Sequence, residues 1–219
     1  MLAFKALLFD LDGTLLDTAP DFIIAINNQL QAHGRQPLAG DAIRSSVSQG
    51  SIGMIESVYG IKQEHPQFDS YKEEFLERYL NNIAEKTRLF NGLQQVLDNC
   101  AQQSIPWGIV TNKPLKYTAP LLVELGLDKQ AATTICPDHV ANPKPDPEAL
   151  LLACSQINTA PSDCIYIGDH IRDIQAGRSA GMRTIAAEWG YIEEPENIDQ
   201  WQADWTVAKS TDLNSLLFC

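Results

Sequence analysis

Two carboxylates stand one residue apart in the stretch FDLDGTLLDT. They are Asp10 and Asp12, and an apolar run over residues 6–9 precedes them. Because side chains two positions apart in an extended segment point the same way, both acids can face one small space. Gly13 then permits a tight turn. An Asp-Gly pair is also a common turn signal, so the two acids indicate chemistry only if suitable partners join them.

Suitable partners follow the later apolar runs. VTNK contains Thr111 and Asn112, NPKPDP contains Lys144, and GDHIRD contains Asp169 and Asp173. An open parallel sheet binds ligands beyond the carboxyl ends of its strands, so we expect these groups to gather with the paired acids. Taken singly, Thr111 or Asp169 could cap a helix, and NPKPDP could be a rigid turn. As an ordered set, these groups favour one shared site.

The gathered groups predict phosphoryl transfer. Acids at close quarters repel one another unless a cation lies among them, and a few hard oxygen ligands suit Mg²⁺. Lys144 and Thr111 add an ammonium and a hydroxyl that can hold anionic oxygens. Asp10 could then attack phosphorus and form an aspartyl-phosphate. Asp12 could protonate the leaving alkoxide and later deprotonate the water that cleaves this intermediate.

The strands that must position these groups can be predicted from the sequence. Short apolar or β-branched runs bounded by turn residues indicate buried parallel strands. We expect strands over residues 5–10, 106–111, 132–136 and 164–168, two further strands at 183–189 and 203–208, and a last helix at 212–217. Helical patterns lie between the strands. Because strand and helix alternate, the predicted fold class is α/β with a parallel sheet.

A helical insertion interrupts this alternation over residues 16–88. Its second half carries an apolar stripe at helical spacing, and we expect Asp21 to cap a helix that ends at His33. The predicted domains are therefore a catalytic core, residues 1–15 with 89–219, and a helical domain, residues 16–88.

The net charge and the cysteine content restrict which binding partners and which cellular compartment we expect. The 219 residues carry a formal net charge of -12, which disfavours nucleic acid and anionic membrane surfaces. The five cysteines are odd in number and form no C-x-x-C pair, so they predict neither a disulfide framework nor a zinc site. No stretch predicts a signal peptide or a membrane span, and we expect a cytoplasmic protein. The sequence does not define an oligomeric state.

The four motifs FDLDGTLLDT, VTNK, NPKPDP and GDHIRD, in this order, resemble the haloacid dehalogenase superfamily. The resemblance spans nearly the whole chain. It implies a Rossmann-like parallel sheet with an α-helical cap inserted after the first motif, and it implies dependence on Mg²⁺. It further implies that Asp10 is the nucleophile and a metal ligand. Asp12 is then the acid/base and offers its main-chain carbonyl to the metal, and Thr111, Asn112 and Lys144 hold the phosphate.

For the fourth motif, the resemblance implies that Asp169 is a metal ligand and that Asp173 is an acid just outside the metal's ligands. The position after Asp169 is often small or acidic in the superfamily, whereas this chain has His170. This departure leaves the surroundings of the metal's water ligands undefined.

Further residues restrict the chemistry expected of this resemblance. Dehalogenases of the superfamily lack an acid at the position of Asp12, and sugar phosphomutases have a hinge histidine where this chain has Phe22. Both differences favour hydrolysis of a small phosphomonoester. The segments LLDTAPDFI, FLERYL, WGIVTNKP and ICPDHV are similar to N-acetylmuramic acid 6-phosphate phosphatases. Phosphoglycolate phosphatases are the second resemblance, and a non-catalytic sensor of a phosphorylated ligand is the alternative of another class.

Substrate choice is expected to lie in the cap, because the core meets only the phosphoryl group. N-acetylmuramate 6-phosphate and 2-phosphoglycolate both carry a carboxylate besides the phosphate, so a cation or hydrogen-bond donors should face the site. We expect these groups to be Arg44 and a loop formed by Ser48, Gln49, Gly50 and Ser51. Arg44 could equally be a solvated charge on a helix.

Overall fold

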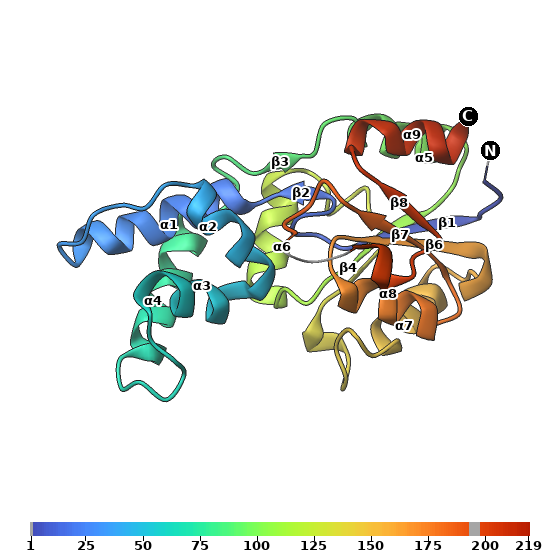
Figure 1. The fold of residues 1–219 in the computed structure, drawn as a ribbon. Coiled ribbons are helices and arrows are strands. Elements are labelled where there is room, and N and C mark those ends of the chain that lie inside the picture. Colours follow the sequence, from blue (N-terminus) through green and yellow to red (C-terminus); the bar gives the residue numbers. More distant parts are fainter. Residues whose placement is uncertain (1, 193–197) are drawn as a thin grey trace. The chain divides into compact units, whose positions relative to one another are not determined.

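The computed structural model describes residues 2–192 and 198–219, which fall into two compact units (Figure 1). The first, here called the sheet unit, comprises Met1–Leu16 and Leu89–Cys219. The second, the helical unit, comprises Asp17–Arg88. The two crossing segments, β2 (Leu16–Asp17) and β3 (Arg88–Leu89), pair as a small two-stranded sheet.

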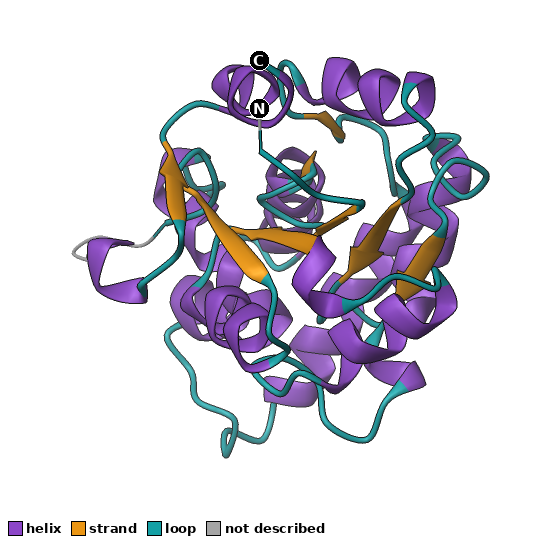
Figure 2. Cartoon of the chain, turned by 90° about the vertical axis from the view of Figure 1, so that its right-hand side faces the viewer, coloured by secondary structure: helices purple, strands orange, loops and turns teal. Residues whose placement is uncertain are grey.

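A six-stranded parallel sheet forms the centre of the sheet unit (Figures 1 and 2). Its strands are β1 (Ala6–Phe9), β4 (Trp107–Val110), β5 (Thr133–Ile135), β6 (Cys164–Gly168), β7 (Arg183–Ala187) and β8 (Trp205–Val207). All six expected strands are confirmed. The predicted α/β class with a Rossmann-like parallel sheet is therefore confirmed as well.

The order of the strands, β5-β4-β1-β6-β7-β8, places β1 where the direction of sheet growth reverses. Such a switch point is where open α/β sheets bind their ligands. In the register of the sheet, Phe9 lies beside Ile109 of β4 and beside Ile167 of β6. Because these three strands are parallel and in step, the residues that follow them emerge together at one edge.

Helices cover both faces of the sheet. Helices α5 (Leu93–Gln102) and α9 (Ser210–Phe218) lie on one side, and α7 (Glu148–Gln156) and α8 (Ile171–Ser179) lie on the other (Figures 1 and 2). Helix α6 (Leu115–Glu124) follows β4. The helix expected at 212–217 is confirmed as part of α9. Among the described residues, no helix is both long and apolar enough to cross a bilayer.

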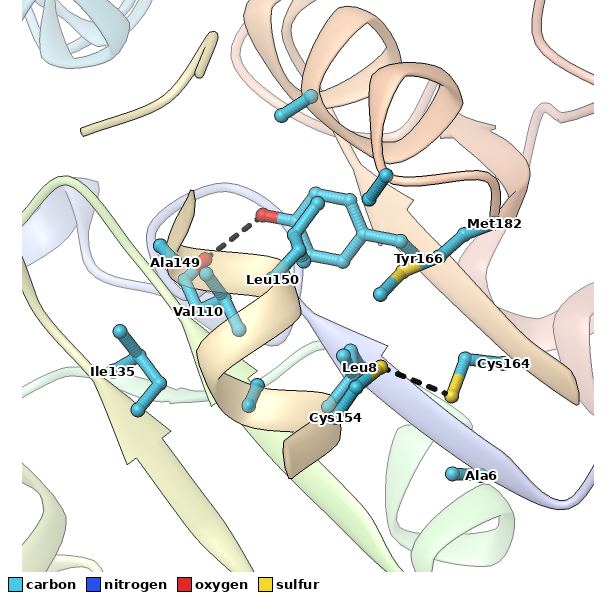
Figure 3. Packing of buried hydrophobic residues seen from close by; sticks show 13 residues of the cluster. Ala6, Leu8, Val110, Ile135, Ala149, Leu150, Cys154, Cys164, Tyr166 and Met182 are labelled. Carbon is cyan, nitrogen blue, oxygen red and sulfur yellow. Dashed lines mark hydrogen bonds between the residues drawn. The ribbon is translucent and has the colours of Figure 1, made fainter. Parts of the chain in front are cut away.

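The core beneath α7 shows how the sheet is held. Leu8 and Val110 from the strands pack with Ala149 and Leu150 from α7, and all four side chains are buried (Figure 3). Burying one side chain of leucine size stabilises a fold by about 1.5–3 kcal/mol. Tyr166 of β6 joins the same cluster, and its hydroxyl donates to the carbonyl of Val110 at 2.8 Å. A polar group thus reaches from the core toward the edge where the sheet ends.

The helical unit contains α1 (Ala19–Ala32), α2 (Asp41–Arg44), a 3-10 turn (Ser45–Gln49), α3 (Gly50–Tyr59) and α4 (Phe68–Asn81). Helix α4 carries the predicted apolar stripe. Its Phe75 and Tyr79 pack on Phe22 of α1, whose ring stacks on that of Tyr79 at 4.0 Å between centroids. These aromatic side chains form the interior of the unit.

The prediction of a loop at residues 48–51 is wrong, because these residues are helical. Ser48 and Gln49 end the 3-10 turn, and Gly50 and Ser51 begin α3. Gly50 adopts a φ of 67°, a conformation that glycine reaches without strain. The chain therefore changes direction at one residue and needs no loop between the two helical segments.

The prediction that Asp21 caps α1 is also wrong, although the predicted end of the helix at His33 is confirmed. The helix begins at Ala19, because Pro20 fits the first turn, which needs no backbone donor there. Asp21 is buried and accepts hydrogen bonds from the Lys86 amide at 2.7 Å, the Thr87 amide at 3.0 Å and the Thr87 hydroxyl at 2.6 Å. It ties α1 to the chain that leaves the unit.

We predict that Asp21→Ala destabilises the helical unit by about 2–3 kcal/mol, because buried donors that lose a charged partner cost about that much. Asp41→Ala, which removes an exposed carboxylate from α2, should change stability by less than about 0.5 kcal/mol. Thermal unfolding measures both effects, and amide exchange at Lys86 and Thr87 locates the first. Equal stability of the two variants would show that this carboxylate does not anchor α1.

Candidate active site

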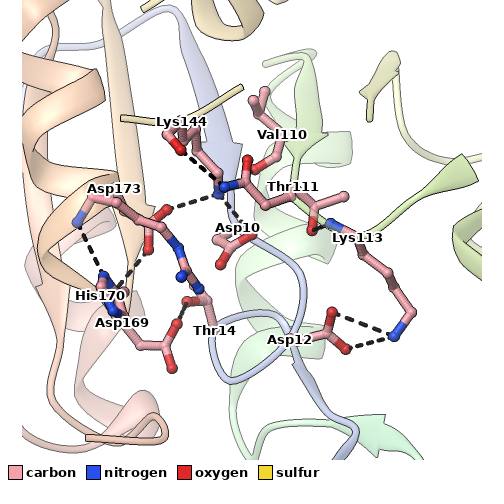
Figure 4. A network of polar contacts seen from close by, with 12 residues as sticks. Asp10, Asp12, Thr14, Val110, Thr111, Lys113, Lys144, Asp169, His170 and Asp173 are labelled. Carbon is pink, nitrogen blue, oxygen red and sulfur yellow. Dashed lines mark hydrogen bonds and ion pairs between the residues drawn. The ribbon is translucent and has the colours of Figure 1, made fainter. Parts of the chain in front are cut away.

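The predicted core residues come together where β1, β4 and β6 end (Figure 4). Asp10 follows β1, Thr111 follows β4 and Asp169 follows β6, as the register of the sheet requires. Lys144 reaches the same place from the segment between β5 and α7, and Asp173 from the first turn of α8. Residues far apart in the sequence are thus neighbours.

Lys144 lies at the centre of this arrangement. Its ammonium nitrogen, Nζ, is 2.8 Å from Asp10 Oδ1 and 2.7 Å from Asp173 Oδ1, and its side chain has no exposed surface. Burial alone lowers the pKa of Lys144, but the charges of Asp10 and Asp173 outweigh it and raise that pKa above its usual value. The charged form of Lys144 is therefore favoured although the side chain is buried. Burial raises the pKa of Asp173, because it disfavours the charged carboxylate, and the Lys144 ammonium partly offsets this by lowering the same pKa.

Three further hydrogen bonds hold Lys144 in place. Nζ donates to the carbonyl of Val110 at 2.9 Å and to the hydroxyl of Tyr166 at 2.7 Å. Asn112 donates its side-chain amide to the main-chain carbonyl of Lys144 at 2.9 Å, so it holds the backbone of the same residue. Sequence reasoning missed Tyr166. The available signal was a tyrosine in the apolar strand CIYIG, since a buried tyrosine hydroxyl usually finds a partner.

Asp12 has a different partner. Its carboxylate forms an ion pair with Lys113, at 3.0 Å and 3.4 Å from the two oxygens (Figure 4). Lys113 is 8% exposed, and its main-chain amide donates to the Thr111 hydroxyl at 3.1 Å. Sequence reasoning missed Lys113 too, although it is the last residue of the quoted VTNK motif. The motif therefore places the Lys113 ammonium beside Asp12 and the Thr111 hydroxyl beside the Lys113 amide.

Three buried acids form a candidate metal site. Asp10, Asp169 and Asp173 each offer a carboxylate oxygen, and these atoms lie within 4.8 Å of one another. Burial, followed by the charge of Asp10, raises the pKa of Asp169 to about 8. Within the described part of the chain, no hydrogen bond in favourable geometry reaches Asp10 Oδ1. Asp10 Oδ1 has the Lys144 ammonium at 2.8 Å, but one ammonium among three buried carboxylates leaves negative charge that fits a hard divalent cation. Mg²⁺ is the usual choice for such a set.

His170 caps a helix. Its Nδ1 accepts a hydrogen bond from the Arg172 amide at 3.1 Å, and its own amide donates to Asp173 Oδ2 at 3.1 Å. This reciprocal pair closes the first turn of α8. Burial lowers the pKa of His170 to about 4, so the imidazole is neutral at pH 7 and its Nδ1 can accept. The unusual residue of the fourth motif thus serves the helix that carries Asp173.

The residues expected to choose the substrate belong to the helical unit. Arg44 ends α2, and its guanidinium donates to Asp17 Oδ1 at 2.9 Å, so it is not simply a solvated charge. Ser48, Gln49, Gly50 and Ser51 lie at the junction between the 3-10 turn and α3. A contact of any of these residues with a substrate stays a prediction.

A model of the haloacid dehalogenase-like hydrolases matches residues 7–187. The chain belongs to this family. The match includes every predicted core motif, from the acids after β1 to the acids at the start of α8. The helical unit, Asp17–Arg88, also falls within the matched range.

Named relatives of this hydrolase are phosphatases. The N-acetylmuramic acid 6-phosphate phosphatase of Pseudomonas putida is 41% identical over 213 residues, which cover 97% of this chain and 96% of the relative. The phosphoglycolate phosphatase of Xylella fastidiosa is 39% identical over 208 residues, covering 93% and 88%. A predicted phosphoglycolate phosphatase from Haemophilus somnus has a crystal structure with a TM-score of 0.82 at 25% identity, covering 99% of both chains. These findings confirm a phosphatase of the haloacid dehalogenase superfamily.

We predict that His170→Ala lowers the stability of this hydrolase by about 1 kcal/mol, the usual cost of losing a helix cap. His170→Asn should keep the stability within about 0.5 kcal/mol, because asparagine is among the best capping residues. Thermal unfolding of both variants measures the difference. If alanine and asparagine lower stability equally, the capping bond does not stabilise α8.

Proposed function

We propose that this hydrolase cleaves a phosphate monoester through an aspartyl-phosphate formed on Asp10. The observation that carries the proposal is the Lys144 ammonium, which lies 2.8 Å from Asp10 Oδ1 within a cluster of buried acids. An anionic nucleophile approaches an anionic ester only where positive charge offsets their repulsion. Lys144 provides such a charge beside the attacking carboxylate, at the edge of the sheet where ligands bind.

Lys144 and the Thr111 hydroxyl would hold the phosphoryl oxygens. Asn112 would keep the backbone of Lys144 in place through its amide, which already donates to the Lys144 carbonyl at 2.9 Å. Asp10 and Asp169 would hold Mg²⁺, together with the main-chain carbonyl of Asp12. When bound, Mg²⁺ would supply positive charge that balances the acids and the transferring group. Asp173, the third acid of the buried cluster, is already paired with Lys144 at 2.7 Å and would stay outside the metal's ligands.

Asp12 would move the protons of both half-reactions. In the first, Asp10 attacks phosphorus, the ester bond breaks, and the leaving alkoxide takes its proton from Asp12. In the second, Asp12 takes a proton from water, which attacks the aspartyl-phosphate and releases inorganic phosphate. Lys113, 3.0 Å from Asp12 Oδ1, orients the carboxylate for these transfers.

N-acetylmuramate 6-phosphate is the proposed substrate, and 2-phosphoglycolate is the alternative. Supporting observations are the near full-length similarity to an N-acetylmuramic acid 6-phosphate phosphatase and the segments that resemble such enzymes outside the four motifs. We propose the helical insertion, residues 16–88, as the cap that selects the substrate, with Arg44 and residues 48–51 as its contacts. Arg44 would exchange Asp17 for the substrate's carboxylate.

We also propose that this hydrolase acts in the cytoplasm on small molecules, without nucleic acid or membrane as partner. The net charge of -12 supports this choice of partner, because it repels other polyanions. All five cysteines are free thiols, and Cys100, Cys136, Cys154 and Cys164 are buried. Unpaired thiols of this kind are typical of a reducing compartment.

We predict that kcat/KM for N-acetylmuramate 6-phosphate exceeds that for 2-phosphoglycolate by about tenfold or more, because further pocket contacts contribute about 1–3 kcal/mol of discrimination. Phosphate release at saturating Mg²⁺, with and without a chelator, measures both values. A clear preference for 2-phosphoglycolate would overturn the substrate and leave the chemistry intact. A protein that binds phosphate but hydrolyses no ester would be a sensor.

We predict that Asp12→Asn separates the two half-reactions on an aryl phosphate. A phenolate leaves without a proton, so attack by Asp10 should continue, whereas hydrolysis of the aspartyl-phosphate should stall for want of a base. The expected result is a burst of at most one phenolate for each active site, and a phosphorylated chain after rapid acid quench. Alkyl phosphates should show neither burst nor turnover.

Asp10→Asn is the matched control for this experiment, because it should give no burst and carry no phosphate. Metal must be saturating in all samples, since the main-chain carbonyl of residue 12 is proposed to bind it whatever the side chain. If Asp12→Asn carries no phosphate after the quench and turns over aryl phosphate like the wild type, Asp12 is not the acid/base.

A further inference from the structure

The loop after β7, Trp189–Tyr191, meets the candidate metal ligand Asp169. The main-chain amide of Tyr191 donates to Asp169 Oδ2 at 2.9 Å, and the side chain of Tyr191 is buried. Gly190 lies against the same carboxylate. A Cβ added to Gly190 would come within 2.6 Å of Asp169 Cγ and would overlap its Cβ and Oδ2, so only glycine fits here.

A second loop reaches the carboxylate of Asp169 from the other side. The Thr14 hydroxyl donates to Asp169 Oδ1 at 3.0 Å. A Cβ added to Gly13 would come within 2.8 Å of Asp169 Cγ and within 2.9 Å of the Tyr191 ring. The loop after β1, which carries Asp10 and Asp12, therefore packs against Asp169 as closely as the loop after β7 does.

The two loops are joined to each other. The indole nitrogen of Trp189 donates to the main-chain carbonyl of Thr14 at 3.1 Å, across 175 positions in the sequence. Trp189 thereby places the residue whose hydroxyl contacts one oxygen of Asp169, while Tyr191 contacts the other. Each oxygen of the Asp169 carboxylate thus accepts a hydrogen bond from a different loop. Because an oxygen can accept in more than one direction, both oxygens keep room for a cation.

We propose that the Trp189–Tyr191 loop is a positioning element that aims the Asp169 carboxylate at a divalent cation held with Asp10. The proposal rests on the role of Asp169 in the proposed function. Partners that orient a metal ligand commonly contribute tenfold to a hundredfold to metal affinity. Gly190 acts by allowing the close approach, the Tyr191 amide by fixing one oxygen, and Trp189 by holding the loop that fixes the other.

The test is the affinity for Mn²⁺, followed by the electron paramagnetic resonance signal of free Mn²⁺, which requires no turnover. We expect Gly190→Ala to weaken Mn²⁺ binding by about tenfold or more, because its Cβ displaces Asp169. Gly40→Ala is the matched control, since its Cβ would make only ordinary contact with Ile23 at 3.5 Å, and its affinity should stay within about twofold of the wild type.

Trp189→Phe gives a second and milder change. It keeps an aromatic ring and the backbone but removes the indole N–H, so Mn²⁺ binding should weaken by about twofold to fivefold, in line with the loss of one hydrogen bond. If Gly190→Ala does not fold, Trp189→Phe decides the matter. Wild-type affinity in every folded variant of this loop would overturn the proposal, as would a wild-type protein that binds no Mn²⁺.

Failure of the proposed function would look different. A protein that binds Mn²⁺ and loses this affinity in Gly190→Ala, yet hydrolyses no phosphate ester, would retain the positioning loop and lose the assignment as a phosphatase. A protein that hydrolyses esters with unchanged Mn²⁺ affinity in both loop variants would keep the function and lose this inference.

Discussion

The placement of one buried ammonium between two buried carboxylates is the constraint on which the rest of the site depends. Lys144 lies 2.8 Å from Asp10 and 2.7 Å from Asp173, and none of the three is exposed by more than a few per cent. Charges out of water are tolerated only when paired in good geometry. One ammonium cannot balance three carboxylates, however, and Asp169 has no ion pair with Lys144 among the described contacts. This residual charge supports the proposal that the site holds a divalent cation and an anionic ligand together.

The parallel sheet makes such a concentration of charge possible. Phe9, Ile109 and Ile167 lie level with one another, so the three segments that follow these strands leave the sheet side by side. The apolar core beneath them, including Leu8 and Val110, holds the strands in register. Asp10 and Asp169 each follow a strand that is buried along its length, and Asp173 lies in the first turn of α8. The cost of gathering like charges is therefore offset by the packing of the apolar core directly beneath them, which includes Tyr166, a partner of Lys144.

The sequence was sufficient for the strands and for the groups that end them, because a short buried run followed by a polar residue is a local pattern. It was insufficient for contacts that depend on register and on loop paths. Trp189 meets Thr14 across 175 positions, and Lys113 meets Asp12 across 101. The error at Asp21 has the same cause. An acid near the start of a helix is typical of a cap, and only the fold shows that Asp21 accepts a hydrogen bond from Thr87 instead.

The proposal that the helical unit selects the substrate follows from what the sheet unit could recognise. Its charged groups would suit a metal and a phosphoryl group, and the phosphoryl group is common to every phosphomonoester. Arg44 in the helical unit is held by Asp17 at 2.9 Å, in the segment where the chain enters that unit. A substrate carboxylate that draws Arg44 from this partner would replace one ion pair with another, so the net gain would be small. Selectivity would then come from the rest of the substrate, which is the part that differs between the proposed sugar acid and the two-carbon alternative.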